Sequence, residues 1–301
     1  MRLSRIACVW CFALVVSLSA YGEDTNWPTL DDNPLGGDPL GARHWAVVTR
    51  DEVQALLEFE DVHAADAYGM TALMWASEKN EDPAVIRTLL DAGADVKARS
   101  RLGRTALMRA ARGNGNPEII GMLLNAGADP DARDFAGRTA LMFAAAGNEN
   151  PEVVETLLAA GADIEARAED GFTALIGAAL VTGNPDVITT LLEAGADIDA
   201  RDRRGATALI RAATMNQSPE IFETLLGAGA DVTIRANDGV TALIAAAWAT
   251  DDPAVILMLL DAGADAEASD ASGRTAYDYI QDNEDLRGTE AYRRLHERRF
   301  E

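Results

Sequence analysis

Residues 134–167 read DFAGRTALMFAAAGNENPEVVETLLAAGADIEAR, and variants of this 34-residue stretch fill most of the chain. A threonine followed by alanine, a proline, a Leu-Leu pair and an Ala-Gly-Ala-Asp segment each recur with the same period. The threonines are Thr71, Thr105, Thr139, Thr173, Thr207, Thr241 and Thr275. Self-similarity at a fixed period of this size indicates stacked copies of one supersecondary unit, because a single packed core has no such period.

Each unit is expected to contain two short helices. Thr139 is a favourable N-cap, and the Ala- and Leu-rich residues after it favour a first helix. Asn150 caps a second helix with Pro151 at its first position, where a missing N–H costs nothing. The apolar stripe of that helix is Val153, Val154, Leu157 and Leu158. Gly161 is the expected left-handed stop. Neither helix can bury its apolar side alone, but stacked neighbours can.

The stretches Asp134–Met142 and Gly161–Asp163 resemble the ankyrin repeat, whose pattern is Asp-x-x-Gly-x-Thr-Pro-Leu-His, two antiparallel helices and Gly-Ala-Asp. The resemblance is to an exported, bacterial-type ankyrin array. It implies an all-α solenoid of helix-turn-helix units joined by β-hairpin-like turns, with six full repeats in residues 66–269. Alanine replaces the family's proline, and Met or Ile replaces its histidine, which puts the polar network of that histidine in question. One extra residue lies between the helices, giving 34 where the family usually has 33.

Residues 1–22 are expected to be a signal peptide. Arg2 and Arg5 precede an apolar run from Ile6 to about Ala20, and cleavage after Ala20 is an alternative. An uncleaved membrane anchor is disfavoured, since the run is short of the ~20 residues that cross a bilayer. The expected location is an exported compartment, the periplasm in preference to the extracellular medium. Both cysteines lie in this segment, so the mature chain would contain no disulfide.

The remainder divides into a leader and one repeat domain. Residues 23–40 are acidic and rich in Pro and Gly, so we expect a flexible leader, with a partner-binding tail as the alternative. Residues 41–301 form the ankyrin-repeat domain, with an N-terminal cap at 41–65 and a C-terminal cap at 270–301. Thr49 and Glu52 form an expected capping box in the first cap, and Thr289 caps a polar helix in the second.

The charge of the chain disfavours nucleic acid as a partner. The net charge is −23, and removing Arg2 and Arg5 leaves 24 basic residues against 49 acidic ones, or −25. Phosphate contacts need a basic surface, which this composition does not supply. We expect a monomer with no membrane span after signal removal, and high negative charge promotes solubility.

The resemblance also implies where a partner binds, because the family's concave face is built from turn tips and the exposed side of the first helix. Those positions carry ten basic residues against four acidic ones, together with aromatic and apolar side chains. Arginine beside Trp, Tyr and Phe is typical of interface hot spots, so a protein partner with an acidic patch is expected. The expected partner-binding residues are Tyr68, Trp75, Arg101, Arg104, Arg109, Arg112, Phe135, Arg138, Phe143, Phe172, Arg203, Arg204, Arg211, Met215 and Trp248.

One position within that set has two interpretations. Trp75 and Phe143 share it with Arg109 and Arg211, and charged residues there favour a position that reaches solvent. The alternative is that the aromatic side chains pack between neighbouring repeats. The regular Arg99, Arg133, Arg167, Arg201 and Arg235 are instead expected to stabilise stacking, because they do not vary within the chain.

The sequence carries no pattern typical of catalysis. Its three histidines, His44, His63 and His296, lie far apart and lack metal-binding spacing. Asp197–Asp202 begins like a calcium loop but places arginine at the fifth position and Asp where the loop needs Gly. No catalytic residue, metal or cofactor is therefore expected, and the protein is not expected to be an enzyme. The favoured function is a non-enzymatic interaction scaffold, with a dedicated inhibitor or immunity-type protein as the alternative. A binder of a small molecule or metal is a third, weaker hypothesis.

Overall fold

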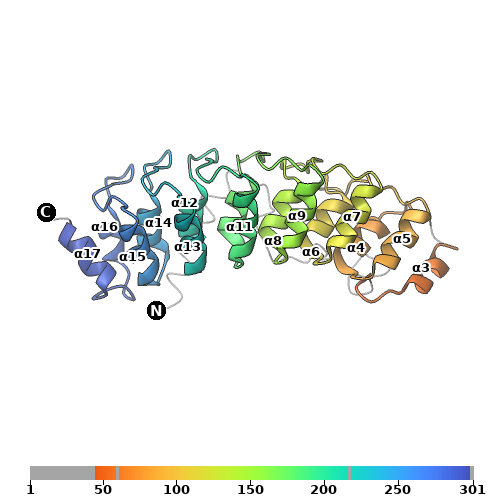
Figure 1. The fold of residues 1–301 in the computed structure, drawn as a ribbon, viewed down its shortest axis with the longest axis horizontal. Coiled ribbons are helices and arrows are strands. Elements are labelled where there is room, and N and C mark those ends of the chain that lie inside the picture. Colours follow the sequence, from red (N-terminus) through yellow and green to blue (C-terminus); the bar gives the residue numbers. More distant parts are fainter. Residues whose placement is uncertain (1–44, 59–60, 216–217, 299–301) are drawn as a thin grey trace.

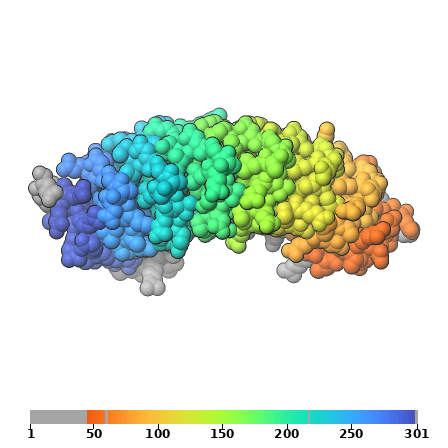
Figure 2. Space-filling model, viewed as in Figure 1, coloured from red at the N-terminus to blue at the C-terminus, as the bar shows by residue number. Residues whose placement is uncertain are grey.

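The computed structural model describes residues 45–58, 61–215 and 218–298, which form one elongated row of helix pairs (Figure 1). The expected signal peptide, the leader and the first residues of the N-terminal cap lie outside these ranges. Fifteen helices and no strand occur in the described part, so the all-α solenoid is confirmed. The space-filling view shows a continuous bowed body in which each repeat touches its neighbours (Figure 2).

Each of the six repeats contributes a first and a second helix. The first helices are α4 (Ala72–Lys79), α6 (Ala106–Gly113), α8 (Ala140–Gly147), α10 (Ala174–Val181), α12 (Ala208–Met215) and α14 (Ala242–Ala249). The second helices are α5 (Pro83–Asp91), α7 (Pro117–Asn125), α9 (Pro151–Ala159), α11 (Pro185–Glu193), α13 (Pro219–Gly227) and α15 (Pro253–Asp261). The first helices pack on one another more extensively than the second helices do.

Local sequence signals place the helix ends. Thr139 accepts a hydrogen bond from the N–H of Met142 at 3.4 Å, and Asn150 accepts one from Glu152 at 3.0 Å. Pro151 occupies the first turn of α9, and Gly161 has a φ of 88° beyond its end. The expected N-caps and the left-handed stop are therefore confirmed for this unit.

Hairpin turns run along one edge of the row and are joined to one another (Figure 1). The N–H of Arg101 donates to the carbonyl of Tyr68 in the preceding turn at 2.8 Å, and equivalent bonds continue along the array. The regular arginines add a second link: Arg99 Nη1 donates to the carbonyls of Gly103 and Arg133, at 2.9 and 2.6 Å. Arg133, Arg167, Arg201 and Arg235 each donate to the carbonyl 34 residues ahead. The expected stacking role of these arginines is confirmed.

Buried asparagines that follow the first helices join each repeat to the one before it. Asn114 Nδ2 donates to the carbonyls of Ser77 and Asn80 in the previous repeat, at 2.9 and 2.7 Å. Asn148 repeats the pattern toward Ala111 and Asn114. All three asparagines are buried, so their amides satisfy main-chain carbonyls that water does not reach.

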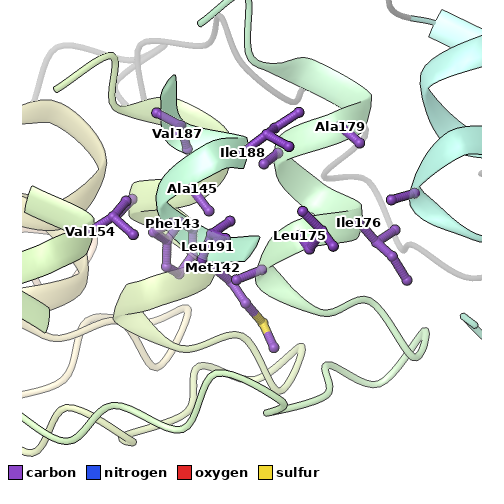
Figure 3. Close-up of a cluster of buried hydrophobic side chains, with 14 of the residues drawn as sticks. Met142, Phe143, Ala145, Val154, Leu175, Ile176, Ala179, Val187, Ile188 and Leu191 are labelled. Atoms are coloured by element: carbon purple, nitrogen blue, oxygen red, sulfur yellow. The ribbon is translucent and has the colours of Figure 1, made fainter. Parts of the chain in front are cut away.

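The core is a continuous apolar layer between the two helix sets. Figure 3 shows Met142 and Ile176 from two first helices in one cluster with Ile188 and Leu191 of α11. Met74, Met108 and Met142 stand where the family has histidine and are 0–3% exposed. Apolar packing thus occupies this position.

Both ends carry helices that close the row. Thr49 and Glu52 form the expected capping box at the start of α3 (Arg50–Leu56). At the other end, α16 (Ala276–Ile280) packs on α14, and α17 (Glu290–Arg298) packs on α15. Thr289 Oγ1 accepts from the N–H of Tyr292 at 3.3 Å, as expected for a cap.

Candidate partner-binding surface

Most of the expected partner-binding residues fall into three rows along the first-helix side, and Arg104, Arg138 and Phe172 occupy the position directly before the repeating threonine. The hairpin-tip row contains Tyr68, Arg101, Leu102, Phe135, Asp170, Arg203 and Arg204. The central row contains Trp75, Arg109, Phe143, Gly177, Arg211, Ala245 and Tyr279, one per unit. The helix-end row contains Glu78, Lys79, Arg112, Gly113, Ala146, Gly147, Leu180, Val181, Thr214, Met215, Trp248 and Ala249.

The central row does not reach solvent as expected. Trp75, Arg109 and Phe143 are 3–4% exposed, and Arg211 is half-buried. Arg109 forms an ion pair with Glu78 of the preceding repeat, and its guanidinium lies 5.6 Å from the ring centroid of Trp75. The expectation of exposure at this position is wrong, because the arginine and the ring satisfy each other and a nearby carboxylate. Whether these residues also bind a partner stays a prediction.

An aspartate at the start of alternate units sets the polar contacts of the central row. Asp66 accepts a hydrogen bond from the indole N–H of Trp75 at 3.1 Å, nine residues ahead. Asp202 accepts from Arg211 Nε at 2.7 Å over the same separation, and the Arg211 guanidinium lies 5.4 Å from the ring centroid of Phe172. Charge-assisted contacts of this kind fix the direction of a guanidinium. Asp270 and Tyr279 repeat the pairing in the C-terminal cap.

In the third unit the aspartate is paired differently, because the side chain of Phe143 has no hydrogen-bond donor. Asp134 instead accepts from Arg138 Nε at 3.0 Å and forms an ion pair with Arg104 at 3.7 Å. Both guanidiniums lie over the Phe143 ring, at 5.2 Å for Arg104 and 5.1 Å for Arg138. Two cations therefore flank one ring and share one carboxylate at the middle of the array.

The hairpin-tip row contains a strongly exposed aromatic side chain. Phe135 is 71% exposed and Leu102, in the adjacent turn, is 40% exposed. A Cβ placed on Gly103 would lie 2.9 Å from the Phe135 ring, so the ring rests on this glycine. Arg101 and Arg203 are exposed, whereas Tyr68 and Arg204 are half-buried.

A half-buried carboxylate follows in the fourth unit. Burial raises the pKa of Asp170 above its ordinary value of 3.8, and the nearby charge of Asp202 adds to the shift. The N–H of Phe172 donates to Asp170 at 3.0 Å and opposes it. The hairpin-tip row therefore changes from apolar and basic in the second and third units to acidic in the fourth.

The helix-end row is charged at one end of the array and apolar at the other. Glu78 forms ion pairs with both Lys79, at 2.9 Å, and Arg109. Arg112 is half-buried, and its side chain makes no hydrogen bond or ion pair with the described residues. Met215 is 61% exposed, and Trp248 is half-buried. Ala146 of the same row is buried.

No metal-binding cluster accompanies these rows in the part of the chain that the structure describes. Within residues 45–58, 61–215 and 218–298, no three His, Cys, Asp or Glu side chains are grouped as metal ligands would be. None of the helices in these ranges is long and apolar enough to cross a membrane.

Two classes of residue that organise the surface were not predicted from the sequence. Glu78 had no assigned partner, and no side-chain contact was predicted for Asp66, Asp134, Asp202 or Asp270. A signal was present: these aspartates are 68 residues apart, and Ser100, Ala168 and Ala236 alternate with them. The residue nine positions after each aspartate is aromatic or arginine, whereas Gly177 and Ala245 follow the two alanines.

Comparison with known proteins agrees with this architecture. The family model for ankyrin repeats in three copies matches overlapping segments of the chain, at residues 12–100, 81–168, 107–202, 141–236 and 175–270. No curated protein matches the chain.

Proposed function

This chain belongs to the ankyrin-repeat family, and we propose that it is a non-enzymatic protein–protein interaction scaffold of an exported compartment, acting as a monomer. Ankyrin repeats generally mediate contacts between proteins. The proposed binding surface is the first-helix side, formed by the hairpin-tip and helix-end rows. The observation that carries the proposal is the exposed Phe135 anchored on Gly103 beside Leu102, on a chain with a net charge of −23.

The chemistry of these rows supports a partner with an acidic patch around apolar side chains. The first-helix side carries the basic side chains of Arg101, Arg112 and Arg203 and the exposed apolar side chains of Phe135 and Met215. Aromatic and arginine side chains dominate the binding energy of protein interfaces when they enter desolvated pockets. Carboxylates on a partner would match the arginines, while the overall negative charge of the chain would repel acidic proteins that lack this geometry.

Export is proposed from the sequence. Arg2 and Arg5 followed by the apolar run form the parts of a signal peptide, and the periplasm is the proposed destination. N-terminal sequencing of protein purified from its native host tests this proposal. A mature chain beginning between Tyr21 and Glu23 would support export, and an intact Met1 in the cytoplasmic fraction would contradict it.

Affinity purification tests the interaction itself. Tagged wild-type protein is expressed in the native host, and co-purified proteins are identified by mass spectrometry. The proposal expects a protein that is recovered with wild type and lost with Phe135→Ser. The matched control is Glu155→Ser on the exposed side of α9, which should retain the partner. Equal recovery with both variants would contradict a first-helix interface.

A further inference from the structure

The side chains of the helix-end row change from charged to apolar along the array. A ligand with one charged end and one apolar end would therefore bind in one orientation. The charged part of the row comprises Glu78 and Lys79 on α4 and Arg112 on α6, and Arg112 is the last charged side chain along it. From α10 onward the row contains Leu180, Val181, Met215 and Trp248 and no charged side chain. These residues belong to successive first helices that pack side by side. A ligand lying along the row therefore meets a cation near one end and apolar side chains near the other.

The basic end is held in place by glycine. A Cβ on Gly147 would lie 3.1 Å from Arg112 Cγ, so the aliphatic part of Arg112 runs over the backbone of the next first helix. Gly113 receives Glu78 in the same way, with a would-be Cβ 2.8 Å from Glu78 Cγ. Glu78 is occupied by Lys79 and Arg109, whereas the guanidinium of Arg112 has no partner among the described residues. Arg112 is thus a positioned cation that no group within residues 45–58, 61–215 and 218–298 pairs with.

The apolar end of the row, on α10, α12 and α14, exposes large apolar side chains. Met215 is 61% exposed, and Leu180, Val181 and Trp248 are half-buried on neighbouring helices. Isolated exposed apolar residues are ordinary on protein surfaces, but contiguous ones mark contact sites. Methionine adapts its shape to different apolar partners, which suits a site that accepts a segment of chain.

From this juxtaposition we infer that the helix-end row binds an extended protein segment with carboxylates at one end and apolar side chains at the other. The carboxylates lie over Arg112, and the apolar side chains lie over Val181, Met215 and Trp248. Four helix-to-helix steps separate α6 from α14. At the usual 8–10 Å between packed helices, they cover roughly 32–40 Å. An extended chain rises about 3.3 Å per residue, so about 10–12 residues span the row. The inference rests on the proposed function, whose partner it describes.

The test uses a phage-displayed library of random 14-residue peptides selected on the full chain. Wild type is expected to enrich peptides with Asp or Glu near one end and Leu, Phe or Trp near the other, always in the same order along the peptide. Arg112→Glu should abolish the acidic enrichment and weaken a chosen peptide about tenfold, as loss of one charge-assisted hydrogen bond predicts. Met215→Ser should reduce the apolar enrichment and leave the acidic one.

The controls separate this inference from the proposed function. Gly147→Ala displaces Arg112 without changing charge and should weaken the acidic preference alone. Circular dichroism and thermal melting check that each variant is folded. Enriched peptides without a fixed order, or with an order that Arg112→Glu leaves unchanged, would overturn the inference. So would a library that yields no binder. In each case a protein recovered with wild type and lost with Phe135→Ser would still support the proposed scaffold.

Discussion

Arg109 and Glu78 belong to neighbouring repeats, yet their side chains form an ion pair that is buried at both ends. The pair lies beside the Trp75 ring and joins α6 to α4. A position that varies between Trp, Arg, Phe and Gly resembles a binding position in sequence. Here its arginine instead stabilises the contact between two repeats.

Arg109→Met should therefore lower stability. Without Arg109, the buried Glu78 keeps only the half-buried Lys79 as an ion-pair partner. The loss should therefore approach, without reaching, the roughly 3–5 kcal/mol that a fully unpaired buried charge costs. Urea denaturation followed by circular dichroism measures the change. Arg112→Met is the control from the same helix, and it should change the free energy of unfolding by less than about 0.5 kcal/mol. Equal effects of the two substitutions would show that the Arg109–Glu78 pair contributes nothing to the stack.

Asn148→Ala should also weaken the array. The amide donates to two carbonyls of the preceding repeat, at 3.0 and 2.8 Å, and its oxygen accepts from Asn150 N–H at 3.0 Å. Leaving buried carbonyls without donors costs about 1–3 kcal/mol. Asn148→Thr is the matched variant, because Thr182 in the next repeat accepts from Asn184 N–H in the same way. A smaller loss for Thr than for Ala, in the same urea titration, is the expected order; the reverse order would contradict the assigned role of the asparagine.

Gly161→Ala and Gly171→Ala distinguish backbone strain from steric conflict. Both glycines have positive φ, 88° and 85°. A Cβ at Gly161 would meet nothing within 4 Å, whereas one at Gly171 would lie 2.7 Å from Arg203 N. Gly161→Ala should cost on the order of 1 kcal/mol for its conformation alone. Gly171→Ala should cost clearly more, because the adjoining turn must move. Identical denaturation midpoints would contradict the close packing of the turns.

Asp170→Asn should stabilise the protein at neutral pH. Burial raises the pKa of Asp170 in the folded state above the ordinary 3.8, so the folded state binds its proton more tightly than the unfolded state does. The free energy of unfolding then falls as pH rises from the ordinary pKa of Asp170 to its raised pKa in the folded state. Above the raised pKa this loss of stability remains. Asparagine keeps an oxygen for Phe172 N–H and carries no charge.

Melting temperatures measured over a range of pH test whether Asp170→Asn is stabilising. The melting temperature of Asp170→Asn should exceed that of wild type at about pH 7, and the difference should shrink toward about pH 3. Asp238→Asn, at the equivalent and exposed tip two units later, is the control and should shift the melting temperature little. A wild type that melts higher than Asp170→Asn at neutral pH would contradict the raised pKa.

Much of the fold follows from short-range signals. Thr139, Pro151 and Gly161 each determine where the adjacent helix begins or ends. Because these residues recur every 34 residues, the helix ends of one unit predict those of the other units. The stacking role of Arg99 and its equivalents could also be predicted, because an invariant residue in a repeat array serves contacts that every repeat makes.

Side-chain partners were less predictable, since they depend on what the neighbouring unit contributes. Arg109 and Arg211 share a position, yet the first pairs with Glu78 of the preceding repeat and the second with Asp202 of its own. The choice depends on whether the unit begins with Asp or Ser. The partner of the arginine therefore depends on two positions of the repeat, and comparing the residues at one position alone does not predict it.

The measurement that tests the central claim most directly is hydrogen exchange of the array with and without its recovered partner. Binding on the first-helix side predicts slower exchange at the hairpin turns around Phe135 and at the ends of α6, α8, α10, α12 and α14. The amides of α7, α9, α11 and α13 should exchange at unchanged rates. Protection concentrated on those second helices would contradict the account.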